Sequence, residues 1–75
     1  MENEISKLNG KPYHLKDVAR IVDPKQQKLY IKHDVYPVDM YTTTDENTKE
    51  DKLVMLFWRE ESKPLYILWK KRELK

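Results

Sequence analysis

The chain has 75 residues, of which 37% are charged, and its formal net charge is +2. This length supports one domain with a modest core, because a chain of this size buries only about 60% of the surface that its unfolded form exposes. The sequence contains no cysteine, which excludes disulfides, thiolate zinc sites and cysteine nucleophiles. The near balance of charges excludes a strong overall attraction to nucleic acid or anionic lipid.

The sequence has no segment typical of export or membrane insertion. The N-terminus, MENEISKL, is acidic, where a signal peptide would be basic and then apolar. The longest apolar runs, LVMLFW and LYILW, are far shorter than the roughly 20 residues that a membrane-spanning helix needs. We therefore expect a soluble cytoplasmic protein that does not act on a membrane.

Residues 1–14 are predicted to form an N-terminal arm or a short hairpin. Asn9 and Gly10 are adjacent, and both residue types tolerate the positive φ angles of a tight turn. The following segment, residues 15–22, fits two structures, because its apolar residues recur at helical spacing while its last four residues also suit a strand. Helix and strand therefore remain open for this segment.

A helix is predicted to begin after Asp23 in the segment DPKQQKLYIKHD. Asp23 suits the cap, and Pro24 suits the first helical position, where its missing N–H costs nothing. Gln26 lies three residues after the cap, as in a capping box. At about 100° per residue, the lysines share one face and Tyr30 faces the opposite way, so we expect this tyrosine to point into the core.

A β-hairpin and a second helix are predicted for the rest of the chain. Residues 38–43 are rich in β-branched and aromatic residues, and residues 52–58 provide a second strand after the polar segment TTTDENTKED. From Ser62, a possible cap, the segment KPLYILWKKREL has the spacing of a helix that is more apolar than one buried stripe requires. The predicted fold is α+β: residues 15–75 form a single small domain of helix, β-hairpin and helix, with a short antiparallel sheet and a possible third strand from the N-terminal segment.

The second strand, KLVMLFW, is apolar on both faces. Alternate strand residues point to opposite sides, so one face carries Leu53, Met55 and Phe57, and the other carries three further apolar residues: Val54, Leu56 and Trp58. Two helices are enough to cover one face. Either the N-terminal segment covers the other face, or a partner molecule docks there.

The segment from residue 23 to residue 74 resembles a group of small uncharacterised proteins of Gram-positive bacteria and their phages. The residues that carry the resemblance are those of a PKQ…YIK…PVD…KLV..F…LY..W pattern: Pro24, Lys25, Gln27, residues 30–32, residues 37–39, residues 52–54, Phe57, Leu65, Tyr66 and Trp69. The resemblance implies a fold of helix, hairpin and helix, and it implies no reaction.

Two departures from that pattern matter. Asp34 stands where such proteins commonly have glycine or asparagine after the first helix, which makes a left-handed cap less certain. Trp58 stands where similar sequences tend to have a polar or acidic residue, which suggests that its face is the outer one. Exposed tryptophan and tyrosine are typical of interface hot spots. We therefore predict a partner or dimer interface formed by Tyr41, Val54, Leu56 and Trp58.

The sequence favours a non-enzymatic protein-binding module that needs no cofactor or metal. The one glycine, Gly10, excludes the usual phosphate-binding loops. His14 and Asp17 are only two potential metal ligands, and two do not make a specific site. The expected partner is a second copy of the chain or a host protein, such as a component of bacterial defence if the chain is phage-borne, which would place it in the host cytosol.

The alternative is a DNA-binding protein. Residues 13–37 also resemble the start of an excisionase-like or MerR-type winged helix-turn-helix protein, in which a second helix contacts DNA. The residues that would do so here are Lys25, Gln26, Gln27, Lys28 and Lys32. The segment that would form the wing, residues 45–51, is acidic, which is unfavourable for phosphate contacts.

Overall fold

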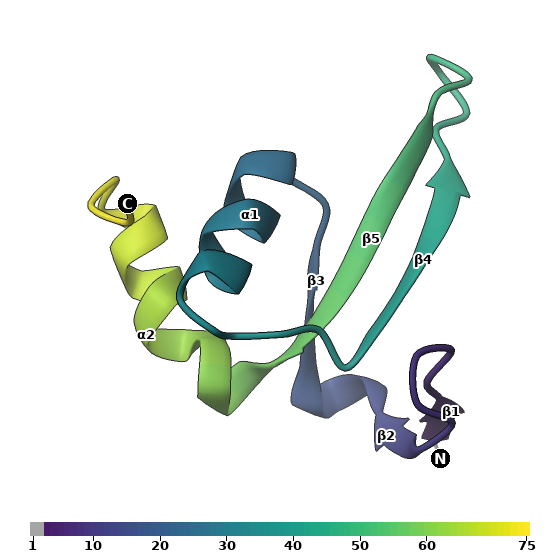
Figure 1. The fold of residues 1–75 in the computed structure, drawn as a ribbon. Coiled ribbons are helices and arrows are strands. Elements are labelled where there is room, and N and C mark those ends of the chain that lie inside the picture. The colour runs from purple at the N-terminus through teal and green to yellow at the C-terminus, as the bar shows by residue number, and fades with distance from the viewer. Residues whose placement is uncertain (1–2) are drawn as a thin grey trace.

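The computed structural model describes residues 3–75, so the first two residues of the predicted N-terminal arm lie outside the described residues. The predicted α+β class is confirmed. The elements, in chain order, are strands β1 (Asn3–Ile5) and β2 (Pro12–His14), the 3-10 turn η1 (Leu15–Asp17), strand β3 (Val18–Ile21), helix α1 (Pro24–Lys32), strands β4 (Asp39–Thr44) and β5 (Asp51–Trp58), and helix α2 (Arg59–Lys70) (Figure 1).

The main sheet has three antiparallel strands in the order β3-β5-β4. Strand β5 is central, with Leu56 opposite Asp39 of β4 on one side and opposite Arg20 of β3 on the other. A central strand with packed side chains on both faces reads as a continuous apolar run. This position explains why the segment KLVMLFW is apolar on both faces.

The first core cluster lies between the sheet and the two helices, which are on the same side of it (Figure 1). Tyr30 of α1 and Phe57 of β5 are both fully buried, and their rings meet edge to face with centroids 4.9 Å apart. Leu65 and Trp69 of α2 pack against the same cluster. The prediction that Tyr30 points into the core is confirmed.

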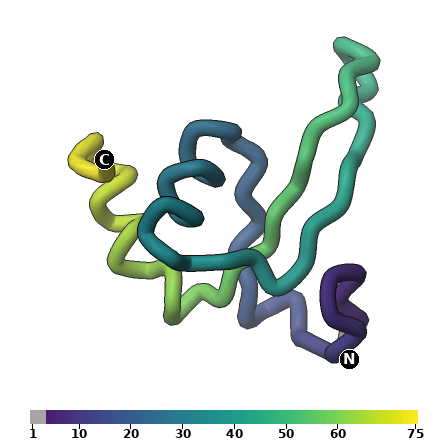
Figure 2. Tube along the Cα trace, in the orientation of Figure 1, coloured from purple at the N-terminus to yellow at the C-terminus, as the bar shows by residue number. Residues whose placement is uncertain are grey.

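The second core cluster lies on the opposite face of the sheet. Val18 of β3 and Val54 and Leu56 of β5 pack there with Tyr13, which comes from the N-terminal hairpin of β1 and β2. Of the two alternatives for residues 1–14, the described residues form the hairpin. It lies at the end of the sheet near the start of β4, far from the C-terminus (Figure 2).

Helix α1 begins as predicted but lacks the full capping box. The Asp23 carboxylate accepts hydrogen bonds from the backbone N–H groups of Lys25 (2.9 Å) and Gln26 (3.2 Å). The Gln26 side chain does not return to the cap, because its amide donates to the Tyr30 hydroxyl at 2.9 Å. After the helix, Asp34 adopts the left-handed conformation with φ 63°, so the aspartate serves where glycine or asparagine would be usual.

Helix α2 begins three residues before the predicted cap. It starts at Arg59, directly after β5, with no loop between them. Ser62 is therefore inside the helix, where its hydroxyl donates to the Trp58 carbonyl at 2.8 Å in the back-bonding geometry of helical serines. The prediction of Ser62 as the cap is wrong, because the strand continues straight into the helix.

Candidate protein-binding surface

Two of the four residues predicted to form an interface are buried inside the chain. Val54 and Leu56 are 0% and 4% exposed. They pack with Val18 of the neighbouring strand and with Tyr13 of the N-terminal hairpin. The expectation that this part of the sheet is an uncovered outer face is therefore wrong, because the hairpin covers it.

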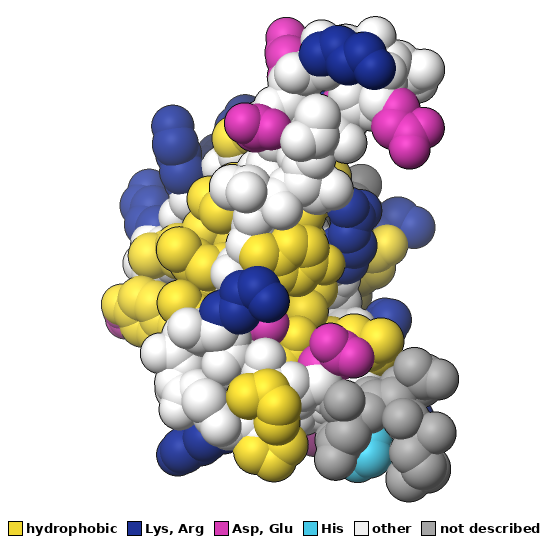
Figure 3. All heavy atoms as spheres, turned by 90° about the vertical axis from the view of Figure 1, so that its right-hand side faces the viewer, with side chains coloured by type: hydrophobic (Ala, Val, Ile, Leu, Met, Phe, Trp, Pro, Cys, Tyr) yellow, Lys and Arg dark blue, Asp and Glu magenta, His cyan; other side chains and the backbone are white. Residues whose placement is uncertain are grey.

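Tyr41 and Trp58 are the predicted interface residues that reach solvent. Tyr41 is half-buried against the second core cluster, and Trp58 is 40% exposed at the end of β5. Figure 3 views the molecule from the β4 side and shows hydrophobic side chains across the middle of this face, below the charged tip of the β4–β5 hairpin. The face therefore keeps accessible apolar surface around a covered core.

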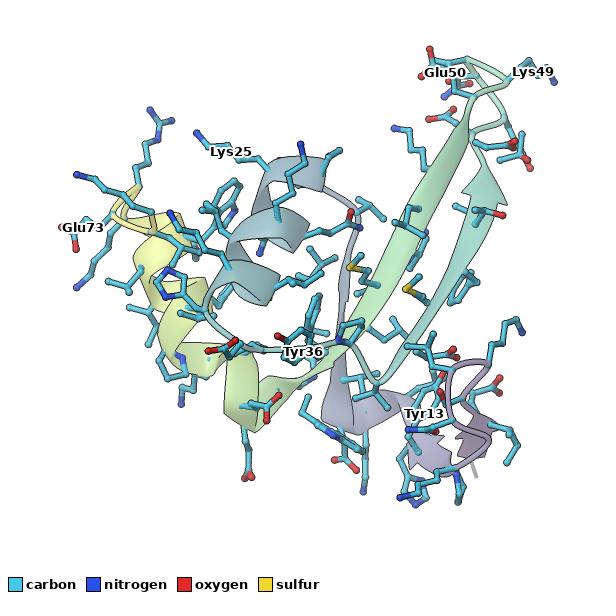
Figure 4. All side chains as sticks on the ribbon, in the orientation of Figure 1. Tyr13, Lys25, Tyr36, Lys49, Glu50 and Glu73 are labelled. Carbon is cyan, nitrogen blue, oxygen red and sulfur yellow. The ribbon has the colours of Figure 1, made fainter. Side chains whose placement is uncertain are left out.

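A buried polar cluster ties the N-terminal hairpin to the sheet. The Asp39 carboxylate, which is 3% exposed, accepts hydrogen bonds from the Tyr13 hydroxyl (2.7 Å), the Lys7 N–H (2.7 Å) and the Met40 N–H (2.9 Å). The Ser6 hydroxyl donates to the Val38 carbonyl beside it. Figure 4 shows Tyr13 projecting from the hairpin toward the start of β4.

The electrostatics of this cluster stabilise the charged form of Asp39. Burial by itself raises the pKa of this carboxyl group, but the hydrogen bonds from Tyr13, Lys7 and Met40, together with the Lys7 charge, lower the pKa below its ordinary value of 3.8. Burial, the hydrogen bond to Asp39 and the charge of Asp39 all raise the pKa of Tyr13. Since both oxygens of Asp39 already accept hydrogen bonds, we assign the cluster a structural role.

The structure contradicts two of the predicted DNA contacts. Gln26 and Gln27 are buried, and their amide groups are engaged within the chain. The Gln27 amide donates to the carbonyls of Ile21 (2.9 Å) and Leu53 (2.8 Å), which fastens α1 to the sheet. The sequence pattern could not show this, because glutamine is usually exposed.

The winged helix-turn-helix fold is not present in the described residues. Its first helix would fall on residues 15–22, which form a short 3-10 turn followed by strand β3. The remaining predicted DNA contacts, Lys25, Lys28 and Lys32, lie exposed on α1. Within residues 3–75, no α-helix precedes α1, whereas a helix-turn-helix joins the DNA-contacting helix to an earlier helix through a short turn.

The histidines do not belong to a metal centre in the described part of the chain. His33 Nε2 lies 2.7 Å from the carbonyl oxygen of Lys75, and His14 is half-buried at the end of β2. Among residues 3–75, no group of three His, Cys, Asp or Glu side chains is placed to hold a metal ion. No helix in this part of the chain is long and apolar enough to cross a membrane.

A groove of about 580 Å³ lies between edge strand β3 and helix α2. Apolar atoms dominate its lining, with Ala19 and Ile21 from β3, Tyr30 from α1 and Tyr66 from α2. The fully buried ring of Tyr30 connects the groove lining to the first core cluster. The groove therefore rests on the first core cluster.

The charged residues of the groove are mostly basic. Arg59 and Lys63 of α2 line it together with one acid, Glu60, and Arg20 borders it on β3. The Arg20 side chain lies on the other face of the sheet, because Arg20 is paired with Leu56. The Arg59 Nε donates to the carbonyl of Lys16 at 3.0 Å, which holds this guanidinium at the rim. No ion pair neutralises these three cations within residues 3–75.

Exposed apolar residues of α2 extend this groove. Tyr66 and Ile67 are 46% and 43% exposed, although Leu65 and Trp69 of the same helix pack on the core. Ile67 follows Lys63 by four residues, so the two side chains share one helical face. We call the groove together with Tyr66 and Ile67 the β3–α2 surface.

The β3–α2 surface was not among the sites expected from the sequence. The one signal in the sequence was that the last helix has more apolar residues than one buried stripe needs. In the structure, the two apolar residues outside that stripe have different environments. Ile67 is exposed, whereas Leu74 folds back after the helix and is 7% exposed in the first core cluster. The basic residues of the groove come from segments far apart in the sequence, so no local pattern joins them.

Comparison of the chain with protein families, with curated proteins and with solved structures found no match. The resemblance to small phage and bacterial proteins therefore remains a prediction from the sequence.

Proposed function

We propose that this chain is a non-enzymatic protein-binding module that docks its partner on the β3–α2 surface. The observation that carries the proposal is the exposure of Tyr66 and Ile67 at 46% and 43% on a helix whose other side already packs in the core. Exposed apolar surface rimmed by charged residues is typical of interaction sites.

The chemistry of the groove favours recognition over reaction. Its one aliphatic hydroxyl, Ser62, already donates to the Trp58 carbonyl, and the Tyr30 hydroxyl accepts from the Gln26 amide. The groove therefore presents apolar surface, cations and the Tyr66 hydroxyl to a ligand, while the Ser62 and Tyr30 hydroxyls serve the fold. Burial of apolar area then contributes roughly 25 cal/mol per Å² to docking.

The biological form of the proposal follows from the resemblance of the sequence to phage and bacterial proteins. If the chain is such a protein, it acts in the bacterial cytosol, where it binds a host protein and blocks its surface. Self-association is the competing form, in which a second copy covers the same surface.

The proposal is tested by capture from a lysate of a Gram-positive bacterium with the wild-type chain and two variants. Ile67→Asp places a charge on the proposed surface and is expected to abolish capture of a defined partner. Lys28→Asp, on the exposed side of α1, also introduces an aspartate and is expected to retain it. Equal capture by both variants would contradict the proposal, and a partner identical to the chain itself would identify self-association.

A further inference from the structure

The outer edge of β3 offers backbone groups that have no partner in the described residues. β3 is an edge strand, paired only with β5. The Val18 N–H donates to the Leu15 carbonyl and not to β5, so the Val18–Trp58 pair is a non-hydrogen-bonded one. Hydrogen-bonded and non-hydrogen-bonded pairs alternate in an antiparallel ladder, so the N–H and C=O of Arg20 point outward.

The opposite strand agrees with this assignment. Leu56 is the β5 residue opposite Arg20, and its carbonyl accepts from the Val38 N–H on the other side, at 2.7 Å. Leu56 therefore directs its carbonyl away from β3. Within residues 3–75, neither backbone group of Arg20 has a hydrogen-bond partner outside the ladder.

The groove runs along this free edge. Ala19, Arg20 and Ile21 supply one wall, and α2 supplies the other through Lys63 and Tyr66. An extended chain paired with β3 would direct alternate side chains toward the helix side, into the groove, and the others away from it. Both the backbone and the side chains of such a segment would thus find contacts, as in recognition by strand addition.

The charge of the groove selects the kind of segment. On the helix side of the edge, the two cations Arg59 and Lys63 lie with one acid, Glu60. The Arg20 side chain lies on the opposite face of the sheet, because Arg20 is paired with Leu56, and the edge as a whole carries an excess of two positive charges (3 − 1 = 2). A basic segment would be repelled, whereas acidic side chains would pair with cations that have no ion-pair partner within residues 3–75. Such complementarity contributes most to specificity and to the association rate.

A second copy of the chain fits this edge poorly. Antiparallel pairing of two β3 strands through their outward groups would place Arg20 opposite Arg20 or next to it. Like charges directly opposite on paired strands are destabilising, and the two basic grooves would lie side by side. The charge pattern therefore favours a different molecule.

We infer that the groove binds an acidic, extended segment of a partner protein, which adds to the free edge of β3 as a fourth strand. This inference rests on the proposed function and names the chemistry of the partner.

The test is a titration of the full, ¹⁵N-labelled chain with a peptide in which glutamate alternates with valine. The expected result is saturable binding in which the Arg20 amide shifts and becomes protected from hydrogen exchange. A peptide with lysine in place of glutamate is expected not to bind. The acidic peptide with N-methylated backbone at alternate positions is expected to lose binding as well, because it cannot pair with a strand.

A matched pair of variants distinguishes the effect of a charge in the groove from the effect of the net charge of the whole chain. Lys63→Glu is expected to weaken binding of the acidic peptide about tenfold, while Lys28→Glu leaves it within about twofold. Absence of binding by the acidic peptide, binding without protection of Arg20, or equal weakening by both variants would overturn the inference. If lysate capture still depends on Ile67 in that case, the proposed function stands and only the acidic strand is wrong.

Discussion

Asp39 is the residue on which the joining of hairpin and sheet depends most. Its buried carboxylate accepts from the Tyr13 hydroxyl and from the N–H groups of Lys7 and Met40. A buried carboxylate is costly unless it is fully hydrogen-bonded, and here each of its oxygens has a donor. These hydrogen bonds offset the cost of burying the charge, and they attach Lys7 and Tyr13 of the N-terminal hairpin to the start of β4.

We predict that Asp39→Asn lowers the free energy of unfolding by about 1–3 kcal/mol. The amide fills the same space, but its NH₂ group would face a donor where an oxygen now accepts. Tyr13→Phe removes the hydroxyl partner and is expected to cost less, about 1 kcal/mol. Urea denaturation of both single variants and of the double variant measures the effect, and additive losses would show that the two groups do not interact.

The lowered pKa of Asp39 predicts a pH dependence of stability. Because the pKa is below 3.8 in the folded chain and near that value in the unfolded chain, the unfolded chain binds more protons in the window between the two. This contribution to stability is therefore fully present well above pH 3.8 and is lost as the pH falls through the folded value.

Urea midpoints measured from neutral pH into this acidic window check the prediction. The wild-type midpoint should fall more steeply than that of Asp39→Asn, so the difference between the two shrinks on acidification. If the difference between the two midpoints stayed constant as the pH fell, the Asp39 carboxylate would not be the source of the pH dependence of stability.

At the scale of elements, the two hairpins share one loop geometry. In the first, the Gly10 N–H donates to the Ser6 carbonyl, and in the second the Lys49 N–H donates to the Asp45 carbonyl. The fifth residue of each loop is left-handed, with φ 72° at Gly10 and 62° at Lys49. Lysine pays a steric cost there that glycine does not. Figure 4 shows Lys49 at the exposed tip, pointing away from the body of the molecule.

We predict opposite effects of substitution at these two positions. Lys49→Gly is expected to raise the free energy of unfolding by about 0.5–1 kcal/mol, and Gly10→Ala to lower it by about 1 kcal/mol. Apart from Gly10 itself and its two chain neighbours, no heavy atom lies within 4 Å of the position that a Cβ at residue 10 would take, so the expected loss there comes from the backbone angle. Thermal unfolding of both variants tests this, and a destabilised Lys49→Gly would refute the shared-loop argument.

At the scale of the whole molecule, the N-terminal hairpin is part of the core. Tyr13 is 5% exposed and packs with Val54 and Leu56. Without it, two large side chains of the central strand would face water. The forfeited burial would be comparable with the whole stability of a small domain.

We therefore predict that a chain truncated to residues 15–75 does not fold stably. Removal of a buried aromatic side chain alone costs about 3–5 kcal/mol, and the truncation also leaves Asp39 without two of its donors. Circular dichroism and binding of a hydrophobic dye, compared with the full chain, provide the measurement. A cooperative thermal transition in the truncated chain, at the temperature of the full one, would contradict this prediction.

Local signals were sufficient for most of the elements. Asp23 and Pro24 mark the start of α1 because capping depends only on adjacent residues, and the confirmed position of Tyr30 follows from helical periodicity alone. The start of α2 was missed because Ser62 has the composition of a cap but lies after a strand that runs directly into the helix. Residues 15–22 stayed undecided because pairing of β3 with β5 selects the strand, and pairing is not encoded locally.

The sequence by itself determined that β5 is apolar on both faces and must be covered twice, because strand alternation follows from backbone geometry. Only the tertiary structure decided what does the covering. The N-terminal hairpin is held by the hydrogen bond between Tyr13 and Asp39, which are more than 25 residues apart in the sequence. The same tertiary arrangement leaves β3 as an edge strand, with the basic groove beside it. Contacts between residues so far apart depend on which apolar surfaces the whole folded chain buries together, and no single segment of the sequence carries that information.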